Sequence, residues 1–573
     1  MKLAEALSIV HKAPADALEF PVLLACGFTP LHLQNYLAAH LQKAMPERRV
    51  RIQTGLYGDL CGTLEQFPQR DGQVVAVALE WTDVDPRLGY RELGGWGQRI
   101  EANILESAEA TLVRIRQAIS SIPPSSKIVI SLPTLPLPPA FHTTGTQASR
   151  AELILRKALA RFGAEIARYP HVAVVNQQRL DSISPPHARY DFRSDLHTGF
   201  PYTLPHADAL GGLLAALIQP PVPKKGLITD LDDTLWAGLV GEDGHDGVSW
   251  DLANHSQIHG LYQQMLHALA DHGILIAIAS KNSPEMVERA LSRQDLLIPR
   301  EKIFPVEVHW EPKSDSVARI LQTWNISAEA VVFVDDSPME LEEVRAAHPG
   351  IECIQFPKSD YAAGLTFLER LRDLFGKATL SQEDSYRLES IRQAQNLVIS
   401  NGNADSVERF LAQAEAEITF EFNPPASDKR VVELVNKTNQ FNLNGIRYSE
   451  PEWHASLKRS GSFVLAVSYR DKFGPLGKIA VLKGVKEDGV VHLDTWVVSC
   501  RAFSRRIEYQ CLACLFSHFE VDEIAFDFQA TPKNKPMEDF LAGLLGRAPL
   551  CSYRLTRTTF EAKCPKLYHK IIK

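Results

Sequence analysis

The sequence predicts an α/β protein of three domains, with a parallel sheet in each of the first two. The chain has 573 residues, which is too long for a single core. Apolar, strand-like runs alternate with helical runs through the first two segments. A proline-rich stretch, QPPVPKKG at residues 219–226, and a polar stretch near residues 376–395 separate segments of ordinary domain size. We therefore expect domains at residues 1–218, 224–378 and 390–573.

The strands expected in each domain follow from these runs. The first domain has FPVLLACGF, QVVAVALEW, SKIVISLPT and VAVVN, with helical runs such as PLHLQNYLAAHLQKA between them. The middle domain has GLITDLDD, a helix around Ile258–His272, and then ILIAIASKN, KIFPVEVHW and AVVFVDDSP. Fully apolar strands, each followed by a helix, are typical of a parallel sheet covered on both faces. The third domain has FVLAVSYRDKFG, GKIAVLKGV, VVHLDTWVVSC, the helix IEYQCLACLFSHF and EIAFDFQ, which predicts an α+β fold.

Composition excludes several classes of protein. The net charge of -8 argues against a nucleic-acid-binding protein, and no apolar run is long enough to span a membrane. The N-terminus lacks the layout of a signal peptide, so we expect a cytoplasmic protein. Eight cysteines in a chain of this length do not form a disulfide framework. Cys511 and Cys514 form a CxxC pair without a second pair at zinc-binding spacing, which favours packing thiols on a helix.

Candidate catalytic groups lie at the ends of the middle-domain strands. Ligands bind beyond the carboxyl ends of the strands in an open parallel sheet. The groups found there are Asp230, Asp232 and Thr234 in DLDDT, Ser280 in IASKN, Lys313 in WEPKS, and Asp335 and Asp336 in FVDDS. Clustered carboxylates repel one another unless a cation or a reacting group offsets their charge. This set of groups therefore predicts phosphoryl chemistry.

Each of these residues has an expected role. Asp230 is the candidate nucleophile that attacks phosphorus and forms an aspartyl-phosphate. Asp232, two residues further on, is the candidate general acid for the leaving oxygen and then the base for water. Ser280 would donate a hydrogen bond to the phosphoryl oxygens, and Lys313 would neutralise their charge.

The same carboxylates predict a magnesium site. Asp230 and Asp335 would hold Mg²⁺, because carboxylate oxygens are the ligands that this ion prefers. Asp336 would assist, either as a ligand or as a hydrogen-bond partner of one. The cation would also relieve the repulsion among the acids of the DLDDT motif.

The order DxDxT, Ser, Lys, DD, with each element at a strand end, resembles the haloacid dehalogenase superfamily. The resemblance implies that the backbone carbonyl of Asp232 is a further metal ligand. It also makes Thr234, Lys281 and Asn282 candidates for substrate binding. Forty-seven residues separate Asp232 from Ser280, and Lys313 lies 33 positions after Ser280. Neither interval can hold a large cap domain, so we expect an open site suited to large substrates.

A closer resemblance is to the FkbH-type branch of that superfamily. It rests on DLDDTLWAGLVGEDG, LVNKTNQFNLNGIRY, WVVSCRAFSRRIE and TPKNKP, and it covers about residues 220–573. The resemblance implies transfer of a glyceryl unit from 1,3-bisphosphoglycerate to an acyl carrier protein with a phosphopantetheine arm. Dephosphorylation accompanies this transfer, which serves polyketide-type biosynthesis. Two other readings stay open, a plain phosphatase for a small phosphorylated metabolite and a docking scaffold without catalysis.

The third domain resembles an N-acetyltransferase (GNAT) fold. In such folds, a glycine-rich turn before a helix holds a pyrophosphate with its backbone amides. Here the turn reads RAFSRRI, with Ser504 and Arg506 where glycines are usual, so we do not expect coenzyme A to bind. Arg501 and Arg505 are candidates to bind a substrate phosphate instead.

Two further groups in the third domain are candidates with two interpretations each. Cys500 is either a thiol that accepts an acyl group, with Arg501 favouring its thiolate, or a buried cysteine at a strand end. Asn436, Lys437 and Asn439 belong to the polar run NKTNQFN, which is either a substrate-binding segment or ordinary turn and cap chemistry.

The first domain resembles an SGNH-type esterase that has lost its catalytic groups. The first strand ends in CGFTP, where Thr29 stands in place of the nucleophilic serine. The Gly-x-Asn-Asp block is missing, and Asp195 and His197 are one residue closer than the usual DxxH spacing. A Ser-His-Asp device needs all its parts in geometry. We therefore expect a degenerate, structural domain, with substrate binding as the alternative.

Overall fold

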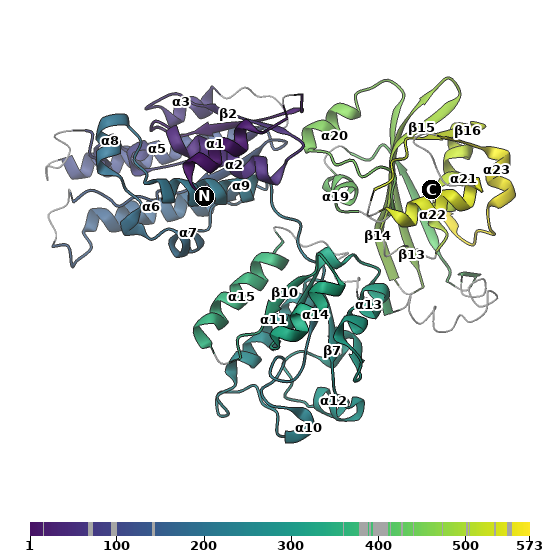
Figure 1. Ribbon diagram of the computed structural model, residues 1–573. Coiled ribbons are helices and arrows are strands. Elements are labelled where there is room, and N and C mark those ends of the chain that lie inside the picture. The colour runs from purple at the N-terminus through teal and green to yellow at the C-terminus, as the bar shows by residue number, and fades with distance from the viewer. Residues whose placement is uncertain are drawn as a thin grey trace. The chain divides into compact units, whose positions relative to one another are not determined.

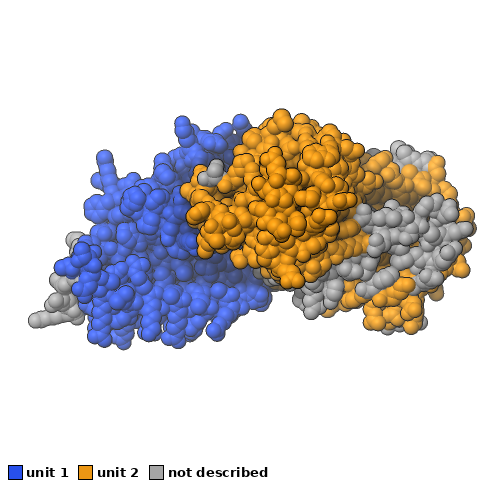
Figure 2. All heavy atoms as spheres, turned by 90° about the horizontal axis from the view of Figure 1, so that it is seen from below, with its two compact units in different colours: residues 1–221 blue, residues 222–573 orange. Residues whose placement is uncertain are grey.

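The chain forms two compact units, residues 1–221 and 222–573, which are coloured blue and orange in Figure 2. The computed structural model describes most of the chain. The residues that it does not describe are 15, 67–72, 93–99, 140–143, 359, 378–387, 389–390, 393–410, 413, 426–427, 439–440, 473, 500–501, 503–504, 532–533, 547–552 and 573. None of the described helices is both long and apolar enough to cross a bilayer.

Unit 1 is an α/β domain with a parallel sheet in the order β2-β1-β3-β4-β5. The strands are β1 (Glu19–Ala25), β2 (Arg49–Thr54), β3 (Val74–Ala78), β4 (Lys127–Ser131) and β5 (Val172–Val174). The helices are α1 (Leu3–His11), α2 (Leu31–Ala44), α3 (Leu60–Glu65), α4 (Trp81–Val84), α5 (Glu101–Ser121), α6 (Arg150–Ile166), α7 (Gln177–Ile183), α8 (Phe192–Thr198) and α9 (Leu204–Ile218). Apolar side chains of α1, α2 and α9 form one core with the sheet, and those of α3, α5 and α6 form another. The sheet is therefore covered on both faces, as its apolar strands predict.

The first part of unit 2 holds a second parallel sheet, which includes β7 and β10 (Figure 1). Its strand order is β10-β9-β6-β7-β8. The strands are β6 (Gly226–Thr229), β7 (Leu275–Ser280), β8 (Ile303–Val308), β9 (Val331–Asp335) and β10 (Glu352–Gln355). The helices are α10 (Val240–Asp243), α11 (Gln257–Asp271), α12 (Pro284–Leu291), α13 (Lys313–Trp324), α14 (Pro338–Ala347) and α15 (Tyr361–Phe375). The strand side chains of the sheet belong to two separate cores. One core contains α11 and α15, and the other contains α13 and α14. From β6 the chain adds β7 and β8 on one side of the sheet, and it then adds β9 and β10 on the other side. Ligands bind at such a switch point, between β6 and β9, in sheets of this kind.

The last part of unit 2 is an α+β domain whose sheet runs β17-β16-β15-β14-β13-β11-β18, with β12 paired to β15. The strands are β11 (Glu417–Phe422), β12 (Phe441–Asn442), β13 (Ser462–Asp471), β14 (Gly474–Glu487), β15 (Val490–Val498), β16 (Glu523–Phe526), β17 (Tyr553–Thr556) and β18 (Lys570–Ile572). The helices are α19 (Lys429–Lys437), α20 (Glu450–Ser456), α21 (Ile507–Phe519), α22 (Lys535–Leu545) and α23 (Arg557–Lys563). Long antiparallel strands dominate this sheet, and β15 and β16 pair in parallel.

Candidate active site

The ends of β6 and β9 bring two buried carboxylates together with a buried lysine. Asp230 directly follows β6, Asp335 ends β9, and Lys313 is the first residue of α13. The Lys313 Nζ atom lies 3.0 Å from Asp230 Oδ1 and 2.6 Å from Asp335 Oδ2. Lys313 is 2% exposed and Asp335 is completely buried. The structure thus brings together three of the residues that the strand ends predict.

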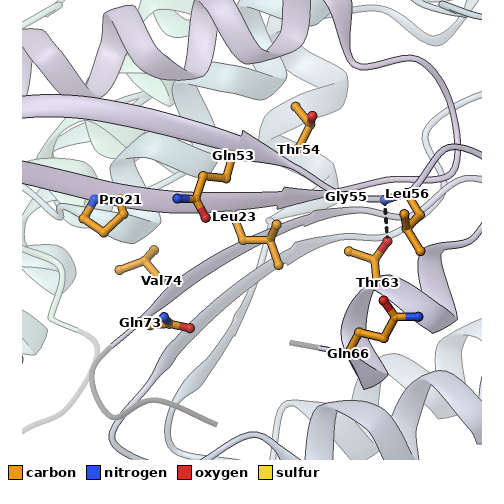
Figure 3. A pocket seen from close by; sticks show the side chains of 10 residues that line it. All are labelled: Pro21, Leu23, Gln53, Thr54, Gly55, Leu56, Thr63, Gln66, Gln73 and Val74. Atoms are coloured by element: carbon orange, nitrogen blue, oxygen red, sulfur yellow. Dashed lines mark hydrogen bonds between the residues drawn. The ribbon is translucent and has the colours of Figure 1, made fainter. Parts of the chain in front are cut away.

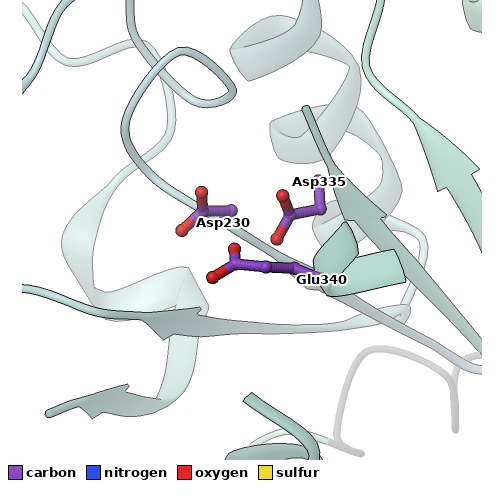
Figure 4. Close-up of side chains that lie close together, drawn as sticks. All are labelled: Asp230, Asp335 and Glu340. Carbon is purple, nitrogen blue, oxygen red and sulfur yellow. The ribbon is translucent and has the colours of Figure 1, made fainter. Parts of the chain in front are cut away.

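A third carboxylate, Glu340 in the first turn of α14, completes this cluster. Its side chain forms an ion pair with Lys313, and its Oε1 atom lies 2.9 Å from Lys281 Nζ. One carboxylate oxygen from each of Asp230, Asp335 and Glu340 lies within 4.8 Å of the other two (Figure 4). Sequence reasoning missed Glu340, because it lies one helical turn beyond a strand end. The motif DDSPME holds the signal that could have found it. A helix that starts at the proline of this motif would turn Glu340 back toward Asp335.

The cluster holds more negative than positive charge, because three carboxylates share the ammonium of Lys313. Burial and the neighbouring Asp230 raise the pKa of Asp335 to about 7, and burial raises the pKa of Asp230 against the effect of Lys313. Burial lowers the pKa of Lys313, but the adjoining carboxylates outweigh it and hold that pKa above its usual value. Burial raises the pKa of Glu340, but Lys313 and Lys281 outweigh this effect and lower it. Three carboxylates around one buried ammonium form an oxygen donor set that fits a divalent cation such as Mg²⁺.

The raised pKa of Asp335 predicts how the stability of the metal-free protein depends on pH. The folded state keeps a proton on Asp335 up to about pH 7, whereas the unfolded state loses it near the ordinary value of 3.8. Unfolding therefore releases this proton, and the contribution of the site to stability falls as the pH rises between these values. Mg²⁺ should raise the unfolding temperature most above about pH 7, where Asp335 has lost its proton and is free to bind it.

Thermal unfolding of the wild type and of Asp335→Asn, each with and without Mg²⁺, measures this effect. We expect Asp335→Asn to flatten this pH dependence and to lose most of the Mg²⁺ response. Asp336→Asn is the matched control, because Asp336 lies outside the cluster. This variant should keep both the pH dependence and the Mg²⁺ response. A full Mg²⁺ response in Asp335→Asn would show that the cation binds elsewhere.

Asp232 lies two residues after Asp230 in the chain and accepts three hydrogen bonds. Trp236 Nε1 donates to Asp232 Oδ1 at 2.9 Å, and the backbone N–H of Val240 donates to the same oxygen at 3.1 Å. Asn282 Nδ2 donates to Asp232 Oδ2 at 2.9 Å and lies 3.4 Å from the buried Ser280 Oγ. Asn282 therefore links Asp232 to Ser280, and its predicted contact with a substrate stays a prediction.

The remaining predicted residues of the middle domain are not among the three clustered carboxylates. Thr234 is completely buried, as Asp335 is, and its predicted contact with a substrate stays a prediction. The Asp336 carboxylate lies 2.8 Å from Lys358 Nζ, which also contacts Asp233, and it is not among the three clustered carboxylates. Lys281, a predicted substrate contact, holds Glu340 in this structure.

In the third domain, the described candidates make structural contacts. Asn436 donates to the Tyr448 carbonyl at 2.7 Å and accepts from the Tyr448 N–H at 2.9 Å, which ties α19 to the following loop. Lys437 forms an ion pair with Glu433 one turn earlier. Arg505 is 2% exposed, and its Nε atom lies 3.6 Å from Asp471 Oδ2. The contacts of Asn436 are those of turn chemistry, the alternative that the sequence left open, and the buried Arg505 offers little surface to a ligand. Cys500, Arg501 and Asn439 lie outside the described residues.

The first domain does not assemble the esterase groups. The Asp195 carboxylate accepts a hydrogen bond from the Tyr190 hydroxyl at 2.8 Å, while the His197 side chain is exposed. We find no hydrogen bond or ion pair between Asp195 and His197, both of which are described. The backbone N–H of Thr29 donates to Gly199 O at 3.0 Å. These contacts hold the end of α8 beside the loop after β1 and do not form a catalytic triad.

The first domain also contains a pocket of about 230 Å³ beside α3 (Figure 3). Its lining consists of Pro21, Leu23, Gln53, Thr54, Gly55, Leu56, Thr63, Gln66, Gln73 and Val74. The described residues of this lining carry no ionisable side chain, and a phosphate or a metal ion requires such charges. The carboxylate cluster of the middle domain is therefore the candidate active site.

Comparison with known proteins places the same region in a family. Residues 239–348 match the family model of haloacid dehalogenase-like hydrolases, a range that includes Ser280, Lys313, Asp335 and Glu340. The N-terminal part of the protein BF1531 from Bacteroides fragilis, containing a phosphatase domain complexed with Mg, has a similar structure. The TM-score is 0.51 at 18% identity, over 66% of this chain and all of that chain. The middle domain is thus a haloacid dehalogenase-like domain.

Two other solved structures match smaller parts of the chain. An uncharacterized protein from Corynebacterium glutamicum matches at 16% identity, over 27% of this chain and 98% of that chain, with a TM-score of 0.19. The cobalt-bound deoxy-D-mannose-octulosonate 8-phosphate phosphatase from Haemophilus influenzae matches at 20% identity, over 32% of this chain and 95% of that chain, with a TM-score of 0.18. No curated protein sequence matches the chain.

Proposed function

We propose that this protein is an Mg²⁺-dependent phosphoryl-transfer enzyme in which Asp230 is the nucleophile. One observation carries the proposal. The carboxylates of Asp230, Asp335 and Glu340 surround the buried ammonium of Lys313. They lie at the carboxyl ends of the adjacent strands β6 and β9. A structural ion pair needs one acid for one base, whereas this site places three acids around one buried lysine. Such an excess of buried negative charge is typical of a site that binds a cation and a reacting group.

The side chains of the middle domain support a two-step reaction. In the first step, a carboxylate oxygen of Asp230 attacks phosphorus, the bond from phosphorus to the leaving oxygen breaks, and Asp232 gives its proton to that oxygen. In the second step, water attacks the phosphorus, Asp232 accepts its proton, and the bond to Asp230 breaks to release inorganic phosphate. Ser280 and Lys313 would hold the phosphoryl oxygens in both steps.

Asp230, Asp335 and Glu340 would hold the Mg²⁺ ion. When bound, the ion would offset the charge of the carboxylates and of the phosphoryl oxygens. The oxygen donor set, the pKa of Asp335 and the magnesium in the Bacteroides fragilis structure support this choice of cation. They agree with the prediction of Mg²⁺ from the sequence.

The finer proposal is that the protein transfers a glyceryl unit from 1,3-bisphosphoglycerate to the thiol of an acyl carrier protein. The carrier thiol attacks the acyl carbon of the mixed anhydride, the thioester forms, and inorganic phosphate leaves. The site at Asp230 then hydrolyses the phosphate ester that remains on the glyceryl unit. The FkbH-type motifs of residues 220–573 support this proposal. The connections from β6 to β7 and from β7 to β8 also support it, because they hold no inserted domain that could cap the site against a large substrate. Cys500 remains the candidate acyl relay, beside a GNAT-like fold for the third domain and a degenerate SGNH-like fold for the first.

Intact-mass spectrometry tests the finer proposal. The protein is incubated with Mg²⁺ and an enzymatic source of 1,3-bisphosphoglycerate, with and without a phosphopantetheinylated carrier protein. We expect a mass increase of one glyceryl group on the carrier, and Cys500→Ala then tests whether the thiol relays it. Release of phosphate without any mass increase would contradict acyl transfer and leave a plain phosphatase for a small phosphorylated metabolite.

A further inference from the structure

The carboxylate of Asp232 is held on both sides by side chains from two different strand ends. Trp236 and the backbone of Val240 donate to Oδ1, and Asn282 donates to Oδ2. The orientation of the Asn282 amide follows from chemistry, because a carboxylate oxygen accepts hydrogen bonds and only the amide nitrogen can donate them. Asp232 is therefore fixed in position and rotation before any substrate arrives.

The groups that hold Asp232 are themselves rigid. Trp236 is completely buried and Asn282 is 4% exposed. The loop that carries Trp236 folds back on itself, because the N–H groups of Leu235 and Trp236 both donate to the carbonyl of Leu231. Leu231 and Leu235 are also completely buried, so this loop cannot move without opening the core beneath it.

We propose that Trp236 and Asn282 are positioning residues that leave Oδ2 of Asp232 as the one atom for proton transfer. This inference rests on the proposed phosphoryl transfer at Asp230. A carboxylate has about four acceptor positions, two on each oxygen. Among the described residues, two donors fill both positions of Oδ1, whereas Asn282 fills one position of Oδ2 and leaves the other open. The proton that goes to the leaving oxygen, and later comes from water, is carried at that free position.

The dependence of the rate on the leaving group tests this assignment. An alkoxide leaving group needs a proton in the transition state, whereas p-nitrophenolate leaves well without one. We expect Asn282→Leu to lower kcat/KM for glycerol phosphate by about 10²-fold. The same variant should lower kcat/KM for p-nitrophenyl phosphate by only about 10-fold. Trp236→Phe keeps the ring and removes the indole N–H, so it should shift the same ratio in the same direction. Its effect should be smaller, because the N–H of Val240 still donates to Oδ1.

Trp324→Phe is the matched control. Trp324 is also a buried tryptophan of the same domain, and its indole N–H donates to the carbonyl of Phe304 at 2.8 Å, away from Asp232. It should leave the ratio of the two kcat/KM values unchanged. Equal losses on both substrates in Asn282→Leu and Trp236→Phe would overturn the positioning role and leave the proposed function standing. A wild-type protein that hydrolyses neither substrate with Mg²⁺ would overturn the proposed function itself, and the inference with it.

Discussion

Asp230→Asn should reduce the Mg²⁺-dependent release of phosphate by about 10³-fold or more, because an amide cannot serve as the attacking nucleophile. The variant should fold normally. Burial raises the pKa of Asp230, which means that its charged form is costly in the folded state, and a neutral amide of the same size removes that cost. Phosphate release and thermal unfolding, measured on the same preparation, separate loss of chemistry from loss of structure.

Asp233→Asn is the matched control for this substitution. Asp233 lies three residues further along the same loop, where it accepts from the Gly238 N–H and pairs with Lys358. It does not belong to the carboxylate cluster, so its amide variant should retain most of the activity. If Asp230→Asn released phosphate as fast as Asp233→Asn does, Asp230 would not be the nucleophile.

Lys313→Met should destabilise the metal-free middle domain by about 3–5 kcal/mol near neutral pH, because it leaves three buried carboxylates without their cation. The loss should be smaller at acidic pH, where protonation removes the repulsion that the substitution exposes. Mg²⁺ should recover part of the loss, since it supplies positive charge at the same carboxylates. Urea unfolding, followed through the transition that responds to Mg²⁺, measures these differences.

Lys358→Met provides the comparison for the loss of a lysine with two acidic partners. Lys358 Nζ lies 3.0 Å from Asp233 and 2.8 Å from Asp336, but the side chain is half exposed. Solvent screens such pairs, so this variant should lose only about 0–1 kcal/mol. If Lys313→Met cost no more than Lys358→Met, the buried cluster would not depend on its lysine.

The arrangement of the candidate site was partly predictable from the sequence, because several of its residues are tied to strand ends. Asp230, Ser280 and Asp335 each stand where an apolar run stops, and a parallel sheet brings such ends together regardless of the distance between them in the chain. Lys313 follows the next strand after a short loop and begins the helix that returns across the sheet. In these four cases the secondary-structure pattern alone fixes the edge on which the side chain lies.

The rest of the site depends on tertiary contacts that a linear pattern does not contain. Glu340 joins the cluster because α14 starts directly beyond β9 and turns it toward Lys313. The amide of Asn282 donates to Asp232, which comes from the neighbouring strand end, and no linear pattern shows that pairing. Thr234 belongs to the same motif as Asp230 and Asp232, yet the loop buries it completely.

The fold shows the same division between local and tertiary information. Alternation of apolar strands and helices predicted the two parallel sheets, and the long strands β13 to β15 of the third domain were readable in the same way. The burial of Arg505 beside Asp471 was not readable, because the two residues lie on elements far apart in the sequence. An arginine in a surface-like polar turn gave no sign that it would be enclosed.

The central claim, that Asp230 carries the phosphoryl group, is tested most directly by trapping the covalent intermediate. The protein is mixed with Mg²⁺ and p-nitrophenyl phosphate or acetyl phosphate, quenched in acid within the first turnovers, digested and examined by mass spectrometry. We predict one added phosphoryl group on the peptide that contains Asp230, and none in Asp230→Asn or without Mg²⁺. Turnover of substrate with no phosphorylated peptide, or with the phosphoryl group on another residue, would contradict the assignment.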